Sequence, residues 1–141
     1  MNKTINEELV ELKEIIIAMH EINKIDSDFT DENKKKSLKL GAKFNKLLKN
    51  LLSSENGIQI LTNSMSDNNP IVVFIISRYL YPLYPKKTMK IMENYQKTIV
   101  DGLEKLRVTD VINGLKSNQP VFMNQFKKLY DTEDLESLNR E

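Results

Sequence analysis

The sequence predicts an all-α protein of six or seven helices, and three observations support this class. Leucine, lysine, isoleucine and asparagine dominate, while glycine and proline number four each, a balance typical of helices joined by short turns. Apolar residues recur at steps of three and four, the period of an amphipathic helix. Pro70, Pro85 and Pro120 each open a predicted helix, and proline suits a first helical turn because its missing N–H would have no partner there.

The first two predicted helices are amphipathic and strongly charged. The first runs from about residue 7 to residue 23, and its apolar stripe comprises Leu9, Leu12, Ile15, Ile16 and Met19. A loop at residues 24–29 leads to Thr30, the expected N-cap of the second, with Asp31 and Glu32 in a first turn where the helix dipole favours negative charge. The buried stripe of the second helix is predicted to be Leu40, Phe44, Leu47, Leu48 and Leu51.

A shorter third helix is expected after residue 52. Ser53 or Ser54 offers its cap, and Ile58, Ile60 and Leu61 are its apolar residues. Gly57 near its start counts against this helix, because glycine disfavours helical geometry.

Residues 67–85 are the most distinctive stretch of the chain. The Asp-Asn-Asn run at 67–69 offers side-chain oxygens to the free N–H groups that follow, and Pro70 fits the first turn of a helix. Six apolar residues then follow without a break, so this helix has no wide polar face and must be covered on several sides. A buried strand would also suit the run, but its continuation to Tyr81 and the starting proline favour a central helix over residues 70–81.

The carboxyl-terminal half is predicted to contain three more helices. Pro82 ends the central helix, and Pro85 opens one that runs to about residue 100 and that Gly102 ends. After a loop around Arg107, a short helix over residues 110–116 is expected with Thr109 as its cap. Pro120 opens the last helix, whose apolar positions are Val121, Phe122, Phe126, Leu129 and Tyr130.

Length and composition predict one domain. A chain of 141 residues with 40% hydrophobic content is large and apolar enough for a core, so we expect a single domain over residues 1–130 and an acidic, frayed tail over residues 131–141. The absence of cysteine excludes disulfides, thiolate chemistry and Cys-based metal sites. The acidic amino terminus does not resemble a signal peptide and no apolar run is long enough to span a membrane, so we expect a cytoplasmic protein.

The helix, Asp-x-x-Pro turn and helix at the centre of the chain resemble the paired helices of HEAT-like repeats. The residues that look like the core signature of a family of small bacterial HEAT-like domains of uncharacterised function are Asp67, Pro70, Val72, Leu80, Pro82, Leu83 and Pro85. The resemblance extends more weakly to Gly102, Leu103, Asp110, Val111 and Leu115, and covers roughly residues 8–116. The chain departs from the family at Ile76 and Ser77, where small residues are usual, and at Val73, where arginine is usual.

This resemblance implies antiparallel helix pairs stacked as a short right-handed array. Domains of this kind are similar to immunity proteins of polymorphic and contact-dependent toxin systems, which neutralise a cognate toxin by stoichiometric binding over its active site. The resemblance therefore implies a protein-binding role. No residues have the spacing of a metal site, a nucleophile or a phosphate-binding loop, so we expect no catalysis, cofactor, metal or small-molecule substrate.

Charged helix faces are the first candidate binding surfaces. The acidic set on the first helix comprises Glu7, Glu8, Glu11, Glu14 and Glu21, and it would suit a basic partner such as a nuclease-type toxin domain. The second helix carries seven lysines, of which Lys35, Lys39, Lys43 and Lys46 fall on one face that would meet phosphates or an acidic protein. A solvated face is the simpler interpretation of both sets, and the lysine helix lacks the arginine expected for bidentate phosphate contacts.

Two further features carry weaker signals. Arg78 with Tyr79, Tyr81 and Tyr84 would form an aromatic contact patch at the end of the central helix, although tyrosines that close a core explain them equally well. His20 is the only histidine, and no nucleophile or second ligand accompanies it, so a boundary position is favoured over catalysis.

Three functions remain open at this point. The leading hypothesis is an immunity protein that binds a cognate toxin. The second is a nucleic-acid-binding HEAT-like domain, related in architecture to the alkyl-purine DNA glycosylases, that uses the lysine face. The third is a regulatory adaptor without a toxin.

Overall fold

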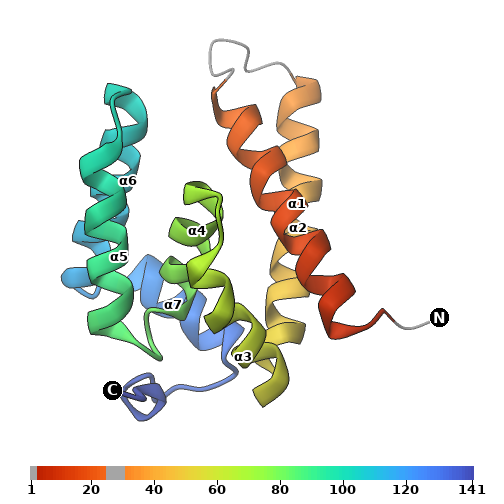
Figure 1. The fold of residues 1–141 in the computed structure, drawn as a ribbon, viewed down its shortest axis with the longest axis vertical. Helices are drawn as coiled ribbons and strands as arrows, with labels where there is room; N and C mark the ends of the chain where they lie inside the picture. Colours follow the sequence, from red (N-terminus) through yellow and green to blue (C-terminus); the bar gives the residue numbers. More distant parts are fainter. Residues whose placement is uncertain (1–2, 25–30) are drawn as a thin grey trace. The chain divides into compact units, whose positions relative to one another are not determined.

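The computed structural model describes residues 3–24 and 31–141, and within these residues it contains helices joined by short turns and no strand (Figure 1). Its α-helices are α1 (Ile5–Lys24), α2 (Asp31–Leu52), α3 (Glu55–Asn63), α4 (Pro70–Leu80), α5 (Pro85–Thr98), α6 (Gly102–Lys116) and α7 (Pro120–Leu129). Two short 3-10 helices, η1 (Ser64–Ser66) and η2 (Glu136–Leu138), complete the described part of the chain. The predicted all-α class of six or seven helices is confirmed, with seven α-helices in the described residues. The Thr30 cap lies outside the described residues, as does the loop expected at 24–29 apart from Lys24.

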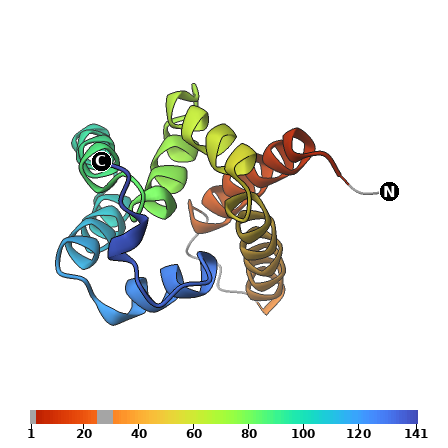
Figure 2. The same cartoon turned by 90° about the horizontal axis from the view of Figure 1, so that it is seen from below.

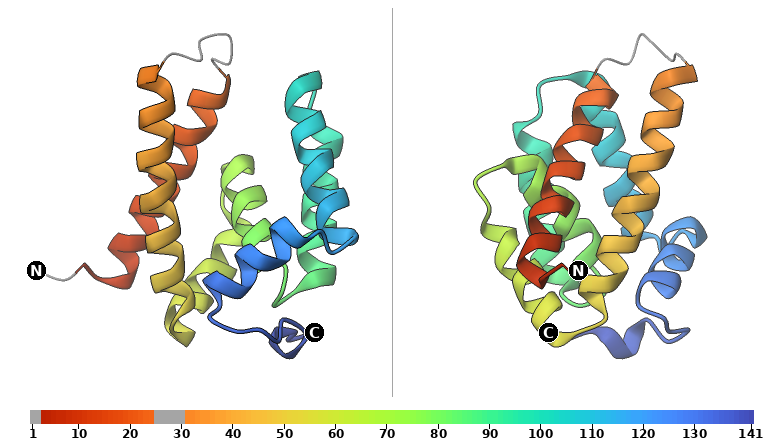
Figure 3. Two further views of the ribbon diagram at one scale, coloured as in Figure 1. Left: turned by 180° about the vertical axis from the view of Figure 1, so that it is seen from behind. Right: turned by 90° about the vertical axis from the view of Figure 1, so that its right-hand side faces the viewer.

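The chain divides into two compact units, residues 1–72 and residues 73–141. In the first unit α1 and α2 run side by side in opposite directions, and α3 packs against both (Figures 1 and 3). The buried apolar residues of these three helices are Leu12, Ile15, Ile16, Phe44, Leu48, Leu51, Leu52, Ile58 and Leu61. The apolar stripes predicted for the first two helices therefore supply most of this core.

A glycine allows α3 to pack closely against the end of α2. The backbone N–H of Gly57 donates to the Ser54 hydroxyl at 3.1 Å, which confirms Ser54 as the cap. Gly57 is buried, and a Cβ atom at this position would lie 1.9 Å from the carbonyl oxygen of Leu51. The residue that seemed to argue against a helix here is the one that the packing requires.

Side-chain caps position the start of α4 as predicted. Asp67 Oδ1 accepts the N–H of Asn69 at 2.9 Å, and Asn69 Oδ1 accepts the N–H of Ile71 at 3.1 Å. The other oxygen of Asp67 lies 2.8 Å from the ammonium group of Lys13 on α1. The hydrogen bond from Lys13, and then the one from the Asn69 N–H, hold the pKa of Asp67 below its ordinary value.

Helix α4 is buried on several sides, as its unbroken apolar run predicts. Its buried residues are Val72, Phe74, Ile76, Ser77, Tyr79 and Leu80. The helix ends at Leu80, one residue before the predicted end. The hydroxyl of Ser77 is fully buried and has no hydrogen-bond partner among the described residues.

In the second unit α5 packs beside α6, and α7 contacts α6 (Figure 2). Aromatic contacts reinforce this unit: the rings of Phe74 and Tyr95 stack with centroids 5.0 Å apart, and those of Tyr81 and Phe126 with centroids 6.5 Å apart. The hydroxyl of Tyr130 donates to the carbonyl oxygen of Tyr79 at 2.6 Å. Burial holds the pKa of Tyr130 above its ordinary value.

The predicted boundary between α5 and α6 is wrong. Gly102 begins a 15-residue helix instead of ending the one before it, and the expected loop around Arg107 is helical. Asp101 is the cap, because its Oδ1 accepts the N–H groups of Leu103 at 2.9 Å and Glu104 at 3.2 Å. Leu103 and Leu106 in the first turns of α6 are exposed, so this part of the helix has no buried apolar stripe by which the sequence could predict it. Thr109 lies inside it and donates to the carbonyl oxygen of Lys105.

The last residues of the chain contact α5, which differs from the frayed tail that we expected. The N–H of Arg140 donates to the carbonyl oxygen of Leu83 at 2.8 Å. The Glu141 carboxylate accepts the N–H groups of Lys86 at 2.7 Å and Lys87 at 2.9 Å. The N-cap residue of α5, Tyr84, supplies no side-chain hydrogen bond, so Glu141 satisfies N–H groups that would otherwise lack a partner. The single domain expected over residues 1–130 stays a prediction.

Candidate functional site

One face of α1 combines carboxylates with exposed apolar side chains. Glu7, Val10, Glu14 and Ile17 follow one another at steps of three, four and three, which places them on one side of the helix. All four are exposed, and the exposed fractions of Val10 and Ile17 are 56% and 40%. Large apolar side chains in water between charges are a feature of protein contact surfaces. We call these four residues the acidic–apolar face.

The structure divides the acidic residues predicted as a partner surface. Glu7 and Glu14 belong to the acidic–apolar face, whereas Glu8 accepts a hydrogen bond from the Asn50 side chain of α2 at 3.4 Å. Glu11 forms an ion pair with Lys3, and this hydrogen bond holds its pKa below the ordinary value. Of the five predicted glutamates, Glu8 and Glu11 are therefore engaged within the first unit, Glu7 and Glu14 face solvent, and Glu21 has an interaction of its own.

The lysine face of α2 is exposed along its length. Its predicted members, Lys35, Lys39, Lys43 and Lys46, are all exposed, as are the three other lysines of the helix, Lys34, Lys36 and Lys49. Leu38 lies among them with an exposed fraction of 74%. The first unit thus presents a positive surface on α2 as well as a negative one on α1.

The predicted patch around Arg78 does not form a single exposed surface. The guanidinium carbon of Arg78 lies 5.0 Å from the ring centre of Tyr79 and 5.3 Å from that of Phe122. Its Nε atom is buried and has no hydrogen-bond partner among the described residues. Arg78 therefore packs against aromatic rings of the second unit, Tyr84 is half-buried, and Tyr81 lines a pocket.

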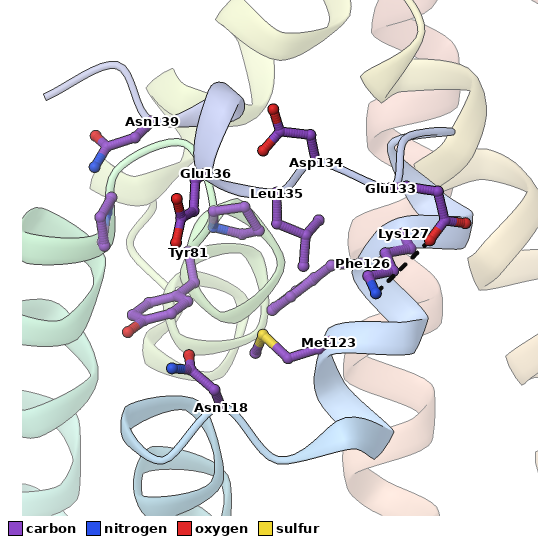
Figure 4. A pocket seen from close by; sticks show the side chains of 12 residues that line it. Tyr81, Asn118, Met123, Phe126, Lys127, Glu133, Asp134, Leu135, Glu136 and Asn139 are labelled. Atoms are coloured by element: carbon purple, nitrogen blue, oxygen red, sulfur yellow. Dashed lines mark ion pairs between the residues drawn. The ribbon is translucent and has the colours of Figure 1, made fainter.

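A pocket of about 450 Å³ lies in the second unit between the end of α4, α7 and the carboxyl-terminal segment (Figure 4). Its apolar walls comprise Tyr81, Pro82, Pro85, Met123, Phe126 and Leu135. Its polar lining comprises Asn118, Lys127, Glu133, Asp134, Glu136 and Asn139. The acidic run after residue 132 is visible in the sequence, but its approach to Tyr81 is not, because it depends on the return of the chain toward α5.

The described residues hold no group of three or more His, Asp or Glu side chains that could bind a metal ion. His20 is half-buried and engaged in an interaction of its own. Within residues 3–24 and 31–141, no helix is both long and apolar enough to cross a membrane. Comparison with models of known families, with curated protein sequences and with solved structures finds no match. The resemblance to HEAT-like domains therefore stays a prediction.

Proposed function

We propose that this protein is a non-catalytic binding module, and that it acts as an immunity protein that neutralises a cognate bacterial toxin with a basic, nuclease-type domain. The acidic–apolar face of α1 carries this proposal, since it pairs exposed carboxylates with exposed apolar side chains on one rigid helix. The immunity role is inferred from the resemblance noted in the sequence. The basic and partly apolar character of the partner is inferred from the acidic–apolar face.

The two components of this face serve different steps of binding. Val10 and Ile17 lie seven residues apart, or about 10 Å along the helix at 1.5 Å per residue, so a single groove of a partner can take both. Their burial supplies affinity, because apolar area removed from water is favourable. The carboxylates of Glu7 and Glu14 accelerate encounter with a cationic surface and reject acidic proteins.

A nuclease domain is a suitable partner because it binds phosphates through a cationic cleft. A helix that presents carboxylates at regular intervals meets the same cations that would otherwise hold the nucleic acid. Binding over that cleft would exclude the substrate without any chemistry on the part of the immunity protein.

Affinity capture with the full chain as bait tests this proposal. We expect the bait to retain a basic protein with a dissociation constant below 1 μM, and to abolish the toxic activity of that protein at a ratio of 1:1. The Glu7→Lys/Glu14→Lys variant should weaken binding about 100-fold or more, because it opposes like charges at the contact. As a control, Asp110→Lys/Glu133→Lys reverses two exposed carboxylates of the second unit and should change the affinity less than about threefold.

The proposal is wrong if no protein is retained, or if both double variants bind the retained protein equally well. A retained partner without toxic activity supports the regulatory adaptor instead.

The exposed lysine face of α2 favours a second candidate, a nucleic-acid-binding domain. Its test is binding to duplex DNA over a series of salt concentrations. Tight binding with a steep salt dependence that Lys35→Gln/Lys39→Gln/Lys43→Gln/Lys46→Gln removes would support it, because each phosphate contact releases a counterion. Absence of binding at low salt rejects it.

A further inference from the structure

The pocket of the second unit has an aromatic and aliphatic floor. Tyr81 and Phe126 stack with their ring planes inclined by 26°, and Met123 and Leu135 extend the apolar surface beside them (Figure 4). Its volume of about 450 Å³ lies within the range of roughly 300–1,000 Å³ that is usual for small-ligand sites. The pocket can therefore hold a group with a substantial apolar portion.

The charge at the rim of this pocket is negative. Three carboxylates, those of Glu133, Asp134 and Glu136, stand against the single ammonium group of Lys127, which leaves a net charge of −2 when all four are ionised. The ammonium group lies 3.7 Å from Glu133, whose side chain is 92% exposed. Asp134 Oδ1 accepts the N–H of Ser137 at 3.3 Å, and Figure 4 shows its side chain pointing away from the floor. This rim therefore favours a cationic ligand over a neutral or an anionic one.

Glu136 differs from the other two acids. Its side chain points from η2 toward Tyr81 and the apolar floor (Figure 4). Its backbone carbonyl accepts the N–H of Asn139, but its carboxylate has no ion pair or hydrogen bond with the described residues. A single carboxylate beside an aromatic ring is a poor metal site, because hard cations need several oxygen ligands. The same pair suits an organic cation, which gains a charge-assisted hydrogen bond from the carboxylate and a cation–π contact from the ring.

We propose that this pocket binds an organic cation whose guanidinium or ammonium group is carried on an apolar stem. The cation contacts Glu136 and the Tyr81 ring, and the stem covers Met123, Phe126 and Leu135. An arginine or lysine side chain of a protein has this chemistry, and so does a free alkylguanidine or alkylamine. The proposal is independent of the acidic–apolar face, because every residue that carries it lies in the second unit.

The carboxyl-terminal segment forms one wall of this site. Leu135 and Glu136 reach the floor because the chain after them is held by the hydrogen bond from the Arg140 N–H to Leu83 and by the contacts of Glu141 with α5. These anchors lie outside the pocket lining, so they position the wall without contacting a ligand.

Titration of the isotope-labelled full chain by NMR, with butylguanidinium as the probe, tests the proposal. We expect shifts of the amide signals of the pocket lining, including Met123 and Leu135, and binding at least about tenfold tighter than that of the neutral analogue butylurea. Glu136→Gln should weaken butylguanidinium binding about tenfold, since only the charge is removed. As a control for net charge, Asp110→Asn removes an exposed carboxylate of α6 and should change the affinity less than about twofold.

Two peptides distinguish the sources of the cation. A short peptide with a central arginine is compared with the same peptide containing citrulline, the neutral isostere. Arginine-dependent binding as tight as that of butylguanidinium indicates a side chain of a partner protein, and binding of butylguanidinium alone indicates a small-molecule cation. The proposal is overturned if the lining signals do not move, if butylurea binds equally well, or if Glu136→Gln leaves the affinity unchanged.

Discussion

The two units of this protein use different side chains for similar helical architectures. The first, residues 1–72, contains ten lysines and no arginine, and its core is almost wholly aliphatic. The second, residues 73–141, contains all five tyrosines and all three arginines, and stacked rings and a buried phenol join its helices. The first unit therefore carries its chemistry on the outer faces of long helices, whereas the second carries it in a concave site.

This difference gives each unit a spectroscopic signature. The chain has no tryptophan, so its intrinsic fluorescence comes from tyrosine and reports only on the second unit. Far-ultraviolet circular dichroism reports on the helices of both. Urea denaturation followed by both signals therefore assigns the effect of a substitution to one unit.

The largest effect is expected where the first unit is packed most closely. Gly57→Ala should lower the free energy of unfolding by about 3 kcal/mol, because the new methyl group would overlap the Leu51 carbonyl oxygen and the backbone must move. The measurement is urea denaturation followed by circular dichroism. Gly41→Ala is the control: no atom lies within 4 Å of its added Cβ, so it should raise the stability by about 0.5–1 kcal/mol. Equal effects of the two substitutions would contradict close packing at Gly57.

The next largest effect is expected in the second unit at Tyr130, whose hydroxyl is hydrogen-bonded. Tyr130→Phe removes the hydrogen bond to the Tyr79 carbonyl oxygen and should cost about 1.5 kcal/mol near pH 7, read by tyrosine fluorescence. Tyr81→Phe, whose hydroxyl has no hydrogen bond among the described residues, should cost less than about 0.5 kcal/mol.

The pH dependence of the Tyr130 effect has a defined sign. Because burial raises the pKa of Tyr130, folding disfavours its ionisation, and the stability that it contributes is lost as the pH rises above the unfolded value of about 10. The difference in the free energy of unfolding between the wild type and Tyr130→Phe should therefore become smaller above about pH 10. A constant difference up to high pH would argue against a buried phenol.

The ion pair between Asp67 and Lys13 should make the stability of the first unit depend on pH in acid. Asp67→Asn should cost about 1 kcal/mol at pH 7, because it removes the pairing with Lys13. The pKa of Asp67 is lowered in the folded state, so this stability is present above the unfolded value of about 3.9 and is lost as the pH falls through the folded value. Urea denaturation followed by circular dichroism at pH 7 and at lower pH should show that the free energies of unfolding of the wild type and Asp67→Asn become equal in acid. Glu14→Gln, at an exposed position, should change the stability by less than about 0.5 kcal/mol.

The smallest effect is expected at the contact of the carboxyl-terminal segment with α5. Glu141→Gln retains an acceptor but removes a charge beside the amino end of the helix, and it should cost about 0.5 kcal/mol. Faster hydrogen exchange of the Lys86 and Lys87 amides would locate the effect. Glu133→Gln alters an exposed acid of the same segment and should leave those amides unchanged. Unchanged exchange in Glu141→Gln would show that the segment is not held by this carboxylate.

Local signals predicted much of the fold. The prolines at 70, 85 and 120 each begin a helix, and Ser54 caps α3, because these effects act within one turn of the chain. The prediction failed at α6, where Asp101 caps a helix whose first turns bury no leucine stripe. Apolar residues at steps of three and four predict a helix only where one face of that helix is buried, and the first turns of α6 have no such face.

The candidate sites were less predictable than the helices. The five glutamates of α1 were visible in the sequence, but the hydrogen bond to Glu8 from Asn50, 42 residues away, was not. In the sequence, Val10 and Ile17 cannot be distinguished from the apolar residues of the buried stripe beside them. Only the structure shows that these two side chains are exposed.

By itself, the sequence determined the all-α class, the starts of several helices and the charged character of α1 and α2, since each depends on neighbours within a few residues. Only the tertiary structure decided that Gly57 permits a close contact, that Arg78 stacks on rings, and that Glu136 faces Tyr81 across a pocket. Arg78 and Phe122 are 44 positions apart and Tyr81 and Glu136 are 55 apart, whereas Gly57 meets Leu51, six residues away, only because α3 packs against the end of α2. Such pairs have no local pattern, because their geometry exists only after the helices have packed.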